Sequence, residues 1–454
     1  MTQDRNLDRD KLDFGNGKIG PLFRALFFPT LIGMIFNSAL TLADGIFVGN
    51  GAGANGIAAV NIVAPLFMLS TGVGLMLGIG ASVIASIRLS EDNVKAARII
   101  MTQAFLAGIL IIGAMIATAL IRPAATVCLL GCSPELQANA TAYLIPLAPS
   151  LIFILVQCIG MMLIRLDGSP KYAMWSQLIP ASINIALDYV MIFPLGMGVT
   201  GAAMATSISC GIGGIMVLTY FVRFADKLRF YRLKLSVTSL LLSMRNTGYM
   251  MKIGFATFLT EGAMGIMMFT GNIAFMKIHG EAGVAAYSIA CFLFPVVFSI
   301  ANAVAQSAQP IISFNHGANR SDRIGRALRV ALLTASICGI MVTVGLWICA
   351  GAIAGAFLPA SEPAYAIASD GLPLFATCAL FFAVNITFIG YYQSIEAAVL
   401  SIFYTLLRGI IFLVPAFIFM PELIGQKGLW LAIPTAEALT LAVIATHYTV
   451  RRRS

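Results

Sequence analysis

The pattern of hydrophobic and polar positions divides this chain into long apolar runs joined by short polar links. A helix needs about 20 apolar residues to cross a bilayer, and twelve runs reach that length. A segment in hydrocarbon must satisfy its own backbone hydrogen bonds, so each run predicts a transmembrane α-helix. The predicted spans are residues 22–49, 56–87, 97–121, 138–165, 172–194, 200–222, 247–276, 283–313, 327–356, 364–392, 396–420 and 428–449.

The composition supports an all-α integral membrane protein. Of the 454 residues, 59% are hydrophobic and only 10% are charged, which is too little polar surface to cover a soluble protein of this length. The net charge of +9 would suggest nucleic-acid binding in a soluble protein, but here the basic residues lie in the links between spans. We therefore expect no nucleic-acid partner.

The distribution of Lys and Arg predicts the orientation. If both termini are cytoplasmic, 24 of the 28 Lys and Arg residues belong to the inner segments. The outer links then hold only Arg122, Lys277 and Lys427, while Arg408 lies inside a span. Cytoplasmic links carry the excess of positive charge, so we expect a multi-pass protein of the bacterial inner membrane with both ends inside. Because the start of the sequence is polar and contains Asp4, we do not expect it to be a cleavable signal peptide.

The two halves of the chain repeat each other. Residues 53–62 (GANGIAAVNI) are similar to residues 280–289 (GEAGVAAYSI), at an offset of 227. Six spans per half with cytoplasmic ends give both halves the same topology, so we predict two six-helix lobes related by a pseudo-twofold axis along the membrane normal. A binding site between two lobes, opened alternately to each side, is a common use of this architecture. The alternative is a duplicated structural scaffold.

These features predict three parts: an N-lobe, a basic cytoplasmic linker, and a C-lobe that ends in a cytoplasmic tail. Their expected limits are residues 1–222, 223–246 and 247–454.

Two carboxylates, Asp44 and Asp188, lie inside apolar runs, where a charge is costly and usually functional. Asp44 lies about five residues and Asp188 about six residues from the outer ends of their spans, and Thr206 lies at a similar depth, so all three fall within one helical turn of the same height. Asn184 precedes Asp188 by one turn, where its amide can bond the carboxylate or share a cation. We therefore predict a cation or proton site formed by these four residues, with Asn37 as a secondary candidate. The alternative is that backbone or water satisfies each group separately.

The second half contains three charged groups about midway along their spans: Glu261, Arg408 and Glu437. An Arg in hydrocarbon requires a counter-charge. We therefore predict a structural ion pair between Arg408 and Glu437, with Glu261 as a candidate third member. The alternative role for Glu261 is binding a cationic substrate or a proton.

Other chemistries find little support. The eight Cys residues are mostly scattered singly through spans, and the three His residues lack metal-ligand spacing, so we expect neither a disulfide framework nor a metal site. Residues 51–56 match GxGxxG, but they link two spans and are interpreted as a turn. A membrane enzyme would need a nucleophile with its base, and none is visible. No cofactor is expected beyond a coupling ion.

Several segments carry a family resemblance. Pro29, Asp44 with Phe47-Val48-Gly49, and the stretches 184–188 (NIALD), 201–206 (GAAMAT) and 309–318 (QPIISFNHGA) together resemble the MATE family of multidrug and toxic compound extrusion transporters, most closely its bacterial DinF and MepA-like branch. The resemblance covers essentially the whole chain.

The resemblance implies a monomeric membrane antiporter that exports cationic or amphipathic drugs in exchange for H⁺ or Na⁺. It also implies a cation site at Asp44, Asn184, Asp188 and Thr206, and a bend in the first span at Pro29. Oxygen ligands suit either ion. The alternative from the same superfamily is a flippase of lipid-linked oligosaccharide, which should line its cavity with several Arg or Lys residues.

Overall fold

The computed structural model describes residues 12–234 and 236–453 of the chain. The expected cytoplasmic ends, residues 1–11 and 454, lie outside the described residues, as does residue 235 of the expected linker. The side chains at 41, 42, 54 and 451–453 also lie outside them.

Every regular element of the described residues is helical, as hydrocarbon requires. Among the described residues, ten helical segments are long and apolar enough to cross a membrane, with the two halves of α1 counted separately. With the 23-residue helix α5 and with the long helix α7 taken as two segments, the structure accounts for the twelve predicted spans. The described residues form two compact units. Unit 1 comprises the described residues up to Gly254 and Ser313–Arg320, and unit 2 comprises Phe255–Ile312 and the residues from Ser321 onward.

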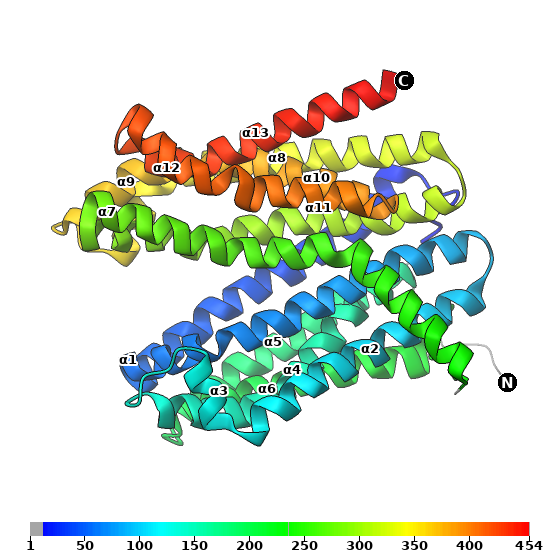
Figure 1. Cartoon of the computed structure of the whole chain (residues 1–454), viewed down its shortest axis with the longest axis horizontal. Helices are drawn as coiled ribbons and strands as arrows, with labels where there is room; N and C mark the ends of the chain where they lie inside the picture. The colour runs from blue at the N-terminus through cyan, green and yellow to red at the C-terminus, as the bar shows by residue number, and fades with distance from the viewer. Residues whose placement is uncertain (1–11, 235, 454) are drawn as a thin grey trace. The chain divides into compact units, whose positions relative to one another are not determined.

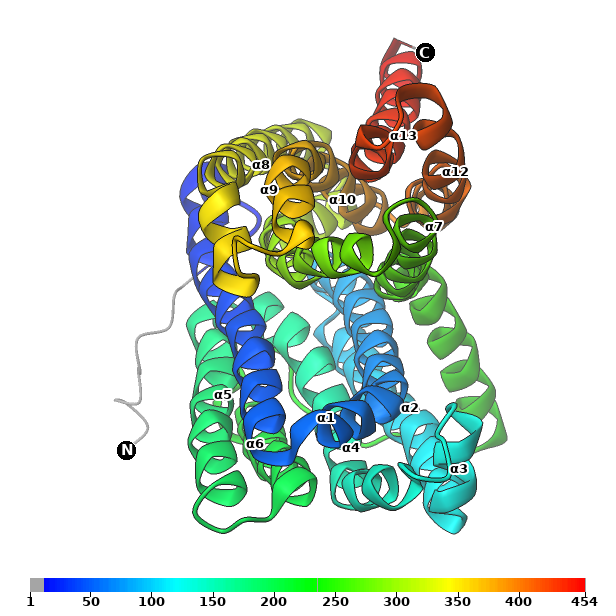
Figure 2. The ribbon, with the colours of Figure 1, turned by 90° about the vertical axis from the view of Figure 1, so that its left-hand side faces the viewer.

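Unit 1 is a helix bundle with α4 at its centre. α4 packs against α1, α2, α5 and α6, and Figure 2 shows these helices side by side. The elements of unit 1 are α1 (Ile19–Ser90), α2 (Val94–Ile121), α3 (Pro123–Leu129), α4 (Gln137–Leu166), α5 (Pro170–Ile192), α6 (Gly198–Thr219) and the π-helical turn η1 (Tyr220–Phe224).

Helices α1 and α7 (Val237–Gly317) each contain one sharp bend, at Gly53 and Gly280. The φ angles there are 68° and 64°, a left-handed conformation that glycine adopts without a Cβ clash. Figure 1 shows α1 folding back along itself at this bend. The turn expected at residues 51–56 is therefore a bend at one glycine inside a nearly continuous helix. The second bend follows the first by 227 residues, which is the offset of the sequence repeat.

Unit 2 contains the middle of α7 and the helices that follow it. α10 packs against α8 and α13, and α12 packs against α13. Span eleven changes from α-helix to a π-helical turn, η2, which contains Arg408. The elements after α7 are α8 (Ser321–Phe357), α9 (Pro363–Ala376), α10 (Cys378–Ser394), α11 (Ala398–Leu406), η2 (Leu407–Ile411), α12 (Leu413–Ile424) and α13 (Lys427–Arg453).

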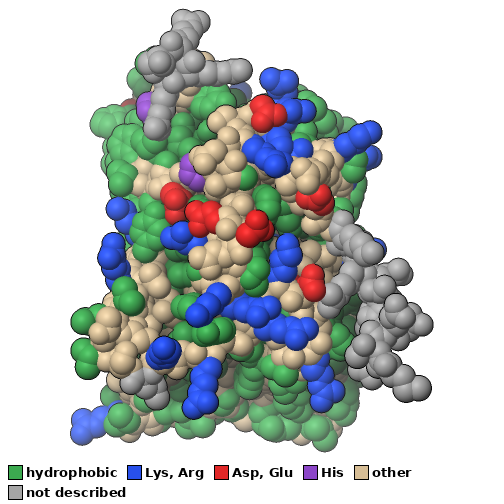
Figure 3. All heavy atoms as spheres, turned by 90° about the vertical axis from the view of Figure 1, so that its right-hand side faces the viewer, with side chains coloured by type: hydrophobic (Ala, Val, Ile, Leu, Met, Phe, Trp, Pro, Cys, Tyr) green, Lys and Arg blue, Asp and Glu red, His purple; other side chains and the backbone are tan. Residues whose placement is uncertain are grey.

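Basic side chains gather where the connections expected to face the cytoplasm lie. In unit 1 these include Arg88 and Lys95 between α1 and α2, and in unit 2 they include Arg326 in the first turns of α8. Figure 3 shows Lys and Arg side chains over this end of the helices.

Candidate functional site

The main polar cluster of unit 1 is a pair of carboxylates inside the helix bundle. Asp188, on α5, is completely buried, with 0% of its surface exposed. Asp44, on the first half of α1, lies beside it, so that the two carboxyl groups interact directly. The ion pairs among the described residues lie elsewhere in the chain. Unit 1 therefore holds two acidic groups together in an apolar bundle.

Most polar atoms of this cluster lack a hydrogen-bond partner among the described residues. These atoms are Oδ1 of Asp44, both carboxylate oxygens of Asp188 and Nδ2 of Asn184. Of the two roles that the sequence left open for Asn184, the amide–carboxylate bond is not formed, and sharing a cation stays a prediction. A buried acceptor without a donor costs about 1–3 kcal/mol, and more if it is charged. The oxygens fit a proton or a hard cation, either of which satisfies them.

Neighbours from α4 and α6 surround the carboxylates. Tyr143 of α4 is only 6% exposed and lies within electrostatic range of both Asp44 and Asp188. Cys210 of α6 lies within range of Asp44, and its carbonyl accepts a 3.0 Å hydrogen bond from Gln157 Nε2 of α4. Sequence reasoning missed Tyr143. Its signal was a phenol inside an apolar span, but only helix packing shows that it meets the carboxylates.

The structure does not establish the roles predicted for three other residues. Thr206 of α6 is half-buried, and within the described chain no hydrogen bond joins its hydroxyl to either carboxylate. Asn37 is exposed. Pro29 lies inside α1, whose interior backbone angles depart from helical values only at Gly53. The roles assigned to these residues stay predictions.

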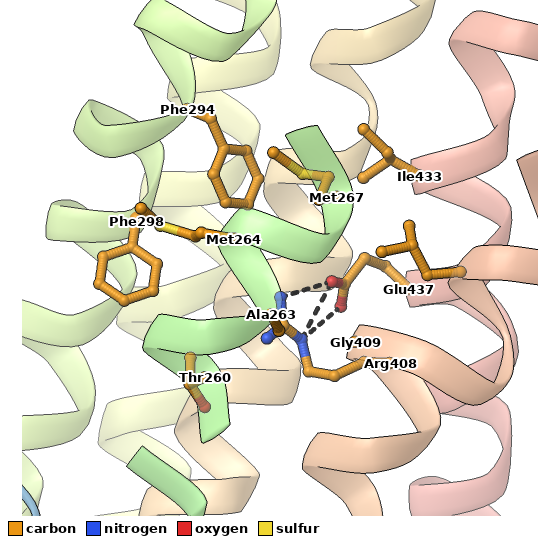
Figure 4. A pocket seen from close by; sticks show the side chains of 11 residues that line it. Thr260, Ala263, Met264, Met267, Phe294, Phe298, Arg408, Gly409, Ile433 and Glu437 are labelled. Atoms are coloured by element: carbon orange, nitrogen blue, oxygen red, sulfur yellow. Dashed lines mark hydrogen bonds and ion pairs between the residues drawn. The ribbon is translucent and has the colours of Figure 1, made fainter. Parts of the chain in front are cut away.

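In unit 2, Arg408 of η2 and Glu437 of α13 form a buried ion pair. Nη2 and Nε of Arg408 donate to Oε1 of Glu437 at 2.7 and 3.0 Å, and the two side chains are 5% and 3% exposed. Figure 4 shows the guanidinium facing the carboxylate across the gap between the two helices. A paired geometry of this kind offsets the cost of removing both charges from water.

Two further side chains complete this pair. Asn385 of α10 is fully buried, and its Nδ2 donates to Oε2 of Glu437 at 2.7 Å and to the Glu437 carbonyl at 2.8 Å. The guanidinium carbon of Arg408 lies 4.4 Å from the ring centre of Phe382, a cation–π contact. Sequence reasoning missed Asn385, whose signal was an amide inside an apolar span.

Glu261 is not part of this pair. It is half-buried on α7, and it forms no ion pair in the part of the chain that the structure describes. Glu261, the candidate third member, therefore does not join the ion pair. The neighbouring face of α7 lies beside Arg408 and Glu437 instead. That face carries Thr260, Ala263, Met264 and Met267, which line a narrow pocket beside the ion pair (Figure 4).

Known proteins resemble this chain along nearly its whole length. Multidrug export protein MepA of Staphylococcus aureus (strain MRSA252) is 23% identical over 439 residues, which cover 95% of each chain. An outward-facing multidrug resistance MATE family transporter of the MOP superfamily has a TM-score of 0.89 and 20% identity, over 98% of this chain and 99% of that chain. A MATE crystallised with MaD3S has a TM-score of 0.87 and 21% identity, with the same coverage. These structural similarities show a shared fold.

The MatE family model matches the chain twice, at residues 29–190 and 256–418. The two matches begin 227 residues apart, which is the offset of the internal repeat. Together they cover more than half of the sequence. The chain therefore belongs to the MatE family and is a multi-pass membrane transporter rather than an enzyme.

Proposed function

We propose that this protein is a secondary active antiporter that exports cationic or amphipathic drugs in exchange for H⁺ or Na⁺. The observation that carries the proposal is the carboxylate pair of unit 1, where Asp188 is fully buried beside Asp44 and both of its oxygens lack donors in the described chain. Two like charges side by side in hydrocarbon favour uptake of a proton or cation. The names of the relatives, which are multidrug exporters, support drugs as the substrates.

The residues of the pair suit the proposed coupling ion. Carboxylate oxygens of Asp44 and Asp188 and the side-chain carbonyl of Asn184 are the hard ligands that Na⁺ accepts, and a proton needs only the carboxylates. The phenol of Tyr143 is near enough to influence both charges. A buried environment with little polar competition strengthens every one of these interactions.

Export against a gradient requires that the ion and the drug weaken each other's binding. In the proposed alternating-access cycle, charge uptake by the carboxylate pair favours one conformation and drug binding favours the other. By linkage, each ligand lowers the affinity of the other by the same factor. Met and Phe side chains, of which the chain has 22 and 30, suit adaptable binding of varied drugs.

The proposal is tested in proteoliposomes that contain the purified protein. A Na⁺ gradient and an H⁺ gradient are imposed separately, and uptake of a fluorescent cationic drug is followed. We expect one gradient to drive uptake and Asp188→Asn to abolish it. Asp370→Asn, which makes the same change at an exposed acid of α9, serves as the control and should transport normally. Drug movement driven by neither gradient would refute the antiport proposal.

No observation favours the flippase. A lipid pyrophosphate would require unpaired basic side chains, but Arg408 is engaged by Glu437 and Phe382. We further propose that the protein works as a monomer in a bacterial inner membrane with both termini cytoplasmic. The support for this orientation is the set of basic connections at one end of the helices in each unit (Figure 3).

A further inference from the structure

The first segment of α7 is much longer than a membrane span. It runs from Val237 to the bend at Gly280, and its 43 residues, 237–279, extend about 64 Å at 1.5 Å per residue. The hydrocarbon layer is only about 30 Å thick. About half of this segment therefore exceeds one crossing, and its first turns, residues 237–246, precede the predicted span 247–276. Ser236 is the N-cap of α7, because its Oγ accepts a hydrogen bond from the Ser239 amide at 3.2 Å.

These first turns present an apolar face outward. Val237, Leu240, Leu241 and Met244 are 77%, 63%, 61% and 65% exposed. Their spacing of i, i+3, i+4 and i+7 places them on one side of the helix. We call these four residues the apolar stripe.

Two polar side chains on another side of the same turns, Ser243 and Asn246, bond to α2 within unit 1. Gln103 of α2 donates from Nε2 to Ser243 Oγ at 2.8 Å, and its Oε1 accepts from Asn246 Nδ2 at 2.9 Å. The helix therefore buries polar groups and exposes apolar ones. This arrangement is the reverse of a helix that faces water, and it is typical of one that faces lipid.

The linker before α7 is held on unit 1 by backbone hydrogen bonds. The carboxylate of Asp167, after α4, accepts hydrogen bonds from the amides of residues 226, 227 and 228 at 2.8 to 3.0 Å. The Lys227 carbonyl accepts from Arg98 Nε at 2.6 Å, and the Tyr231 amide donates to Thr102 Oγ1 at 3.0 Å. These bonds hold residues 226–231 of the linker against α2 and the end of α4.

The anchored linker leaves three basic side chains exposed within the eight residues that precede the apolar stripe in the chain: Arg229, Arg232 and Lys234. None of the three forms an ion pair with an acidic side chain of the described chain. Arg245 is exposed on the same first turns of α7. We call these four residues the basic cluster.

We propose that the basic cluster and the apolar stripe form a binding surface for anionic phospholipids of the membrane. The stripe enters the acyl layer, and the guanidinium and ammonium groups contact the headgroup phosphates. Anionic lipid is favoured over zwitterionic lipid because each basic residue at a membrane surface strengthens binding by about fivefold. This surface acts independently of the carboxylate pair and of the drug.

The test compares retained lipids by native mass spectrometry. The full-length protein in detergent is titrated with phosphatidylglycerol or phosphatidylcholine at equal concentrations. We expect the unmodified protein to retain phosphatidylglycerol at least about tenfold better, and the preference to fall as salt is raised from low to high ionic strength. The triple variant Arg229→Gln, Arg232→Gln, Lys234→Gln should lose most of it.

The matched control removes three exposed basic residues from the opposite ends of the helices: Arg122→Gln, Lys277→Gln, Lys427→Gln. This control should keep the preference. Equal retention of the two lipids by the unmodified protein, or equal loss in both triple variants, would overturn the proposal. So would detergent-stable dimers that dissociate in Leu240→Ser, Leu241→Ser, because a second copy would then cover the stripe. All the substitutions are at exposed positions, and unchanged gel-filtration profiles confirm that each variant is folded.

Discussion

Units 1 and 2 differ in whether their buried carboxylates have hydrogen-bond or ion-pair partners. In unit 1, Asp188 and Asp44 lie side by side with oxygens that accept no hydrogen bond from the described residues. In unit 2, Glu437 accepts from both Arg408 and Asn385. The carboxylates of the first arrangement lack donors within the described chain until they take up positive charge, whereas the Glu437 carboxylate of the second is paired with a guanidinium and an amide. The contrast supports the proposals that unit 1 binds the coupling ion and that the Arg408–Glu437 pair of unit 2 stabilises its bundle.

The difference is not in the backbone. Residues with positive φ recur at the offset of 227 in both halves: Gly53 and Gly280, Asp92 and Asn319, and Gly198 and Gly425. The charged positions do not recur: Asp44 corresponds to Gly271, Asp188 to Pro415, Arg408 to Ala181, and Glu437 to Cys210. The repeat has therefore kept the turns that define the fold while the buried chemistry of the halves has diverged.

The largest expected effect is that of Asp188→Asn in unit 1. We expect drug resistance to fall to the level of cells without the transporter, because the change removes the charge that the ion must meet. The melting temperature should not fall, since a buried charge is removed rather than stranded. Drug susceptibility and thermal unfolding in detergent measure the two effects. Full resistance in this variant would end the assignment of ion binding to unit 1.

Glu437→Gln in unit 2 should have the opposite profile. Arg408 loses its counter-charge in a buried site, which costs about 3–5 kcal/mol of stability, and the melting temperature should fall. The double variant Arg408→Met, Glu437→Gln should recover much of the loss, because no charge is then left buried alone. A single variant as stable as the unmodified protein would show that the pair does not stabilise unit 2.

Coupling between ion binding and drug binding should appear as a dependence of drug affinity on ion concentration. Drug binding to the purified protein should weaken as H⁺ or Na⁺ concentration rises, by a factor in the range of about 5 to 150 that is common for linked sites. Asp188→Asn should flatten this dependence, and the control Asp370→Asn should not. If drug affinity of the unmodified protein did not change with either ion, the carboxylates would not couple ion binding to drug transport.

The smallest effect is expected at Tyr143. Tyr143→Phe keeps the ring and removes only the hydroxyl near the two carboxylates, a change of about 0.5–1.5 kcal/mol for one hydrogen-bonding group. The ion concentration for half-maximal transport should therefore shift by about two- to tenfold, while maximal transport changes little. A complete loss of transport would instead assign this phenol an essential role.

Sequence patterns predicted much of this protein because a membrane restricts the possible structures. In hydrocarbon, backbone N–H and C=O groups must bond within the protein, and an α-helix does this within one segment. Each sufficiently long apolar run therefore predicted one of the twelve spans. Charge is rare there, so Asp44, Asp188, Arg408 and Glu437 stood out without any structure. The repeat of glycines at an offset of 227 indicated two similar halves, and the two matches to the MatE family model agree with it.

Other features depended on tertiary structure. Helical periodicity assigns a residue to a face but does not say how each helix rotates against its neighbours. The placement of Tyr143 within electrostatic range of the carboxylates and the hydrogen bonds of Asn385 to Glu437 follow only from that rotation, as does the separation of Glu261 from the ion pair. From the sequence we could identify the charged residues that lie inside apolar spans and therefore need partners. The packing of the helices decided which of them find partners, because a buried polar group is satisfied only by neighbours that approach it in three dimensions.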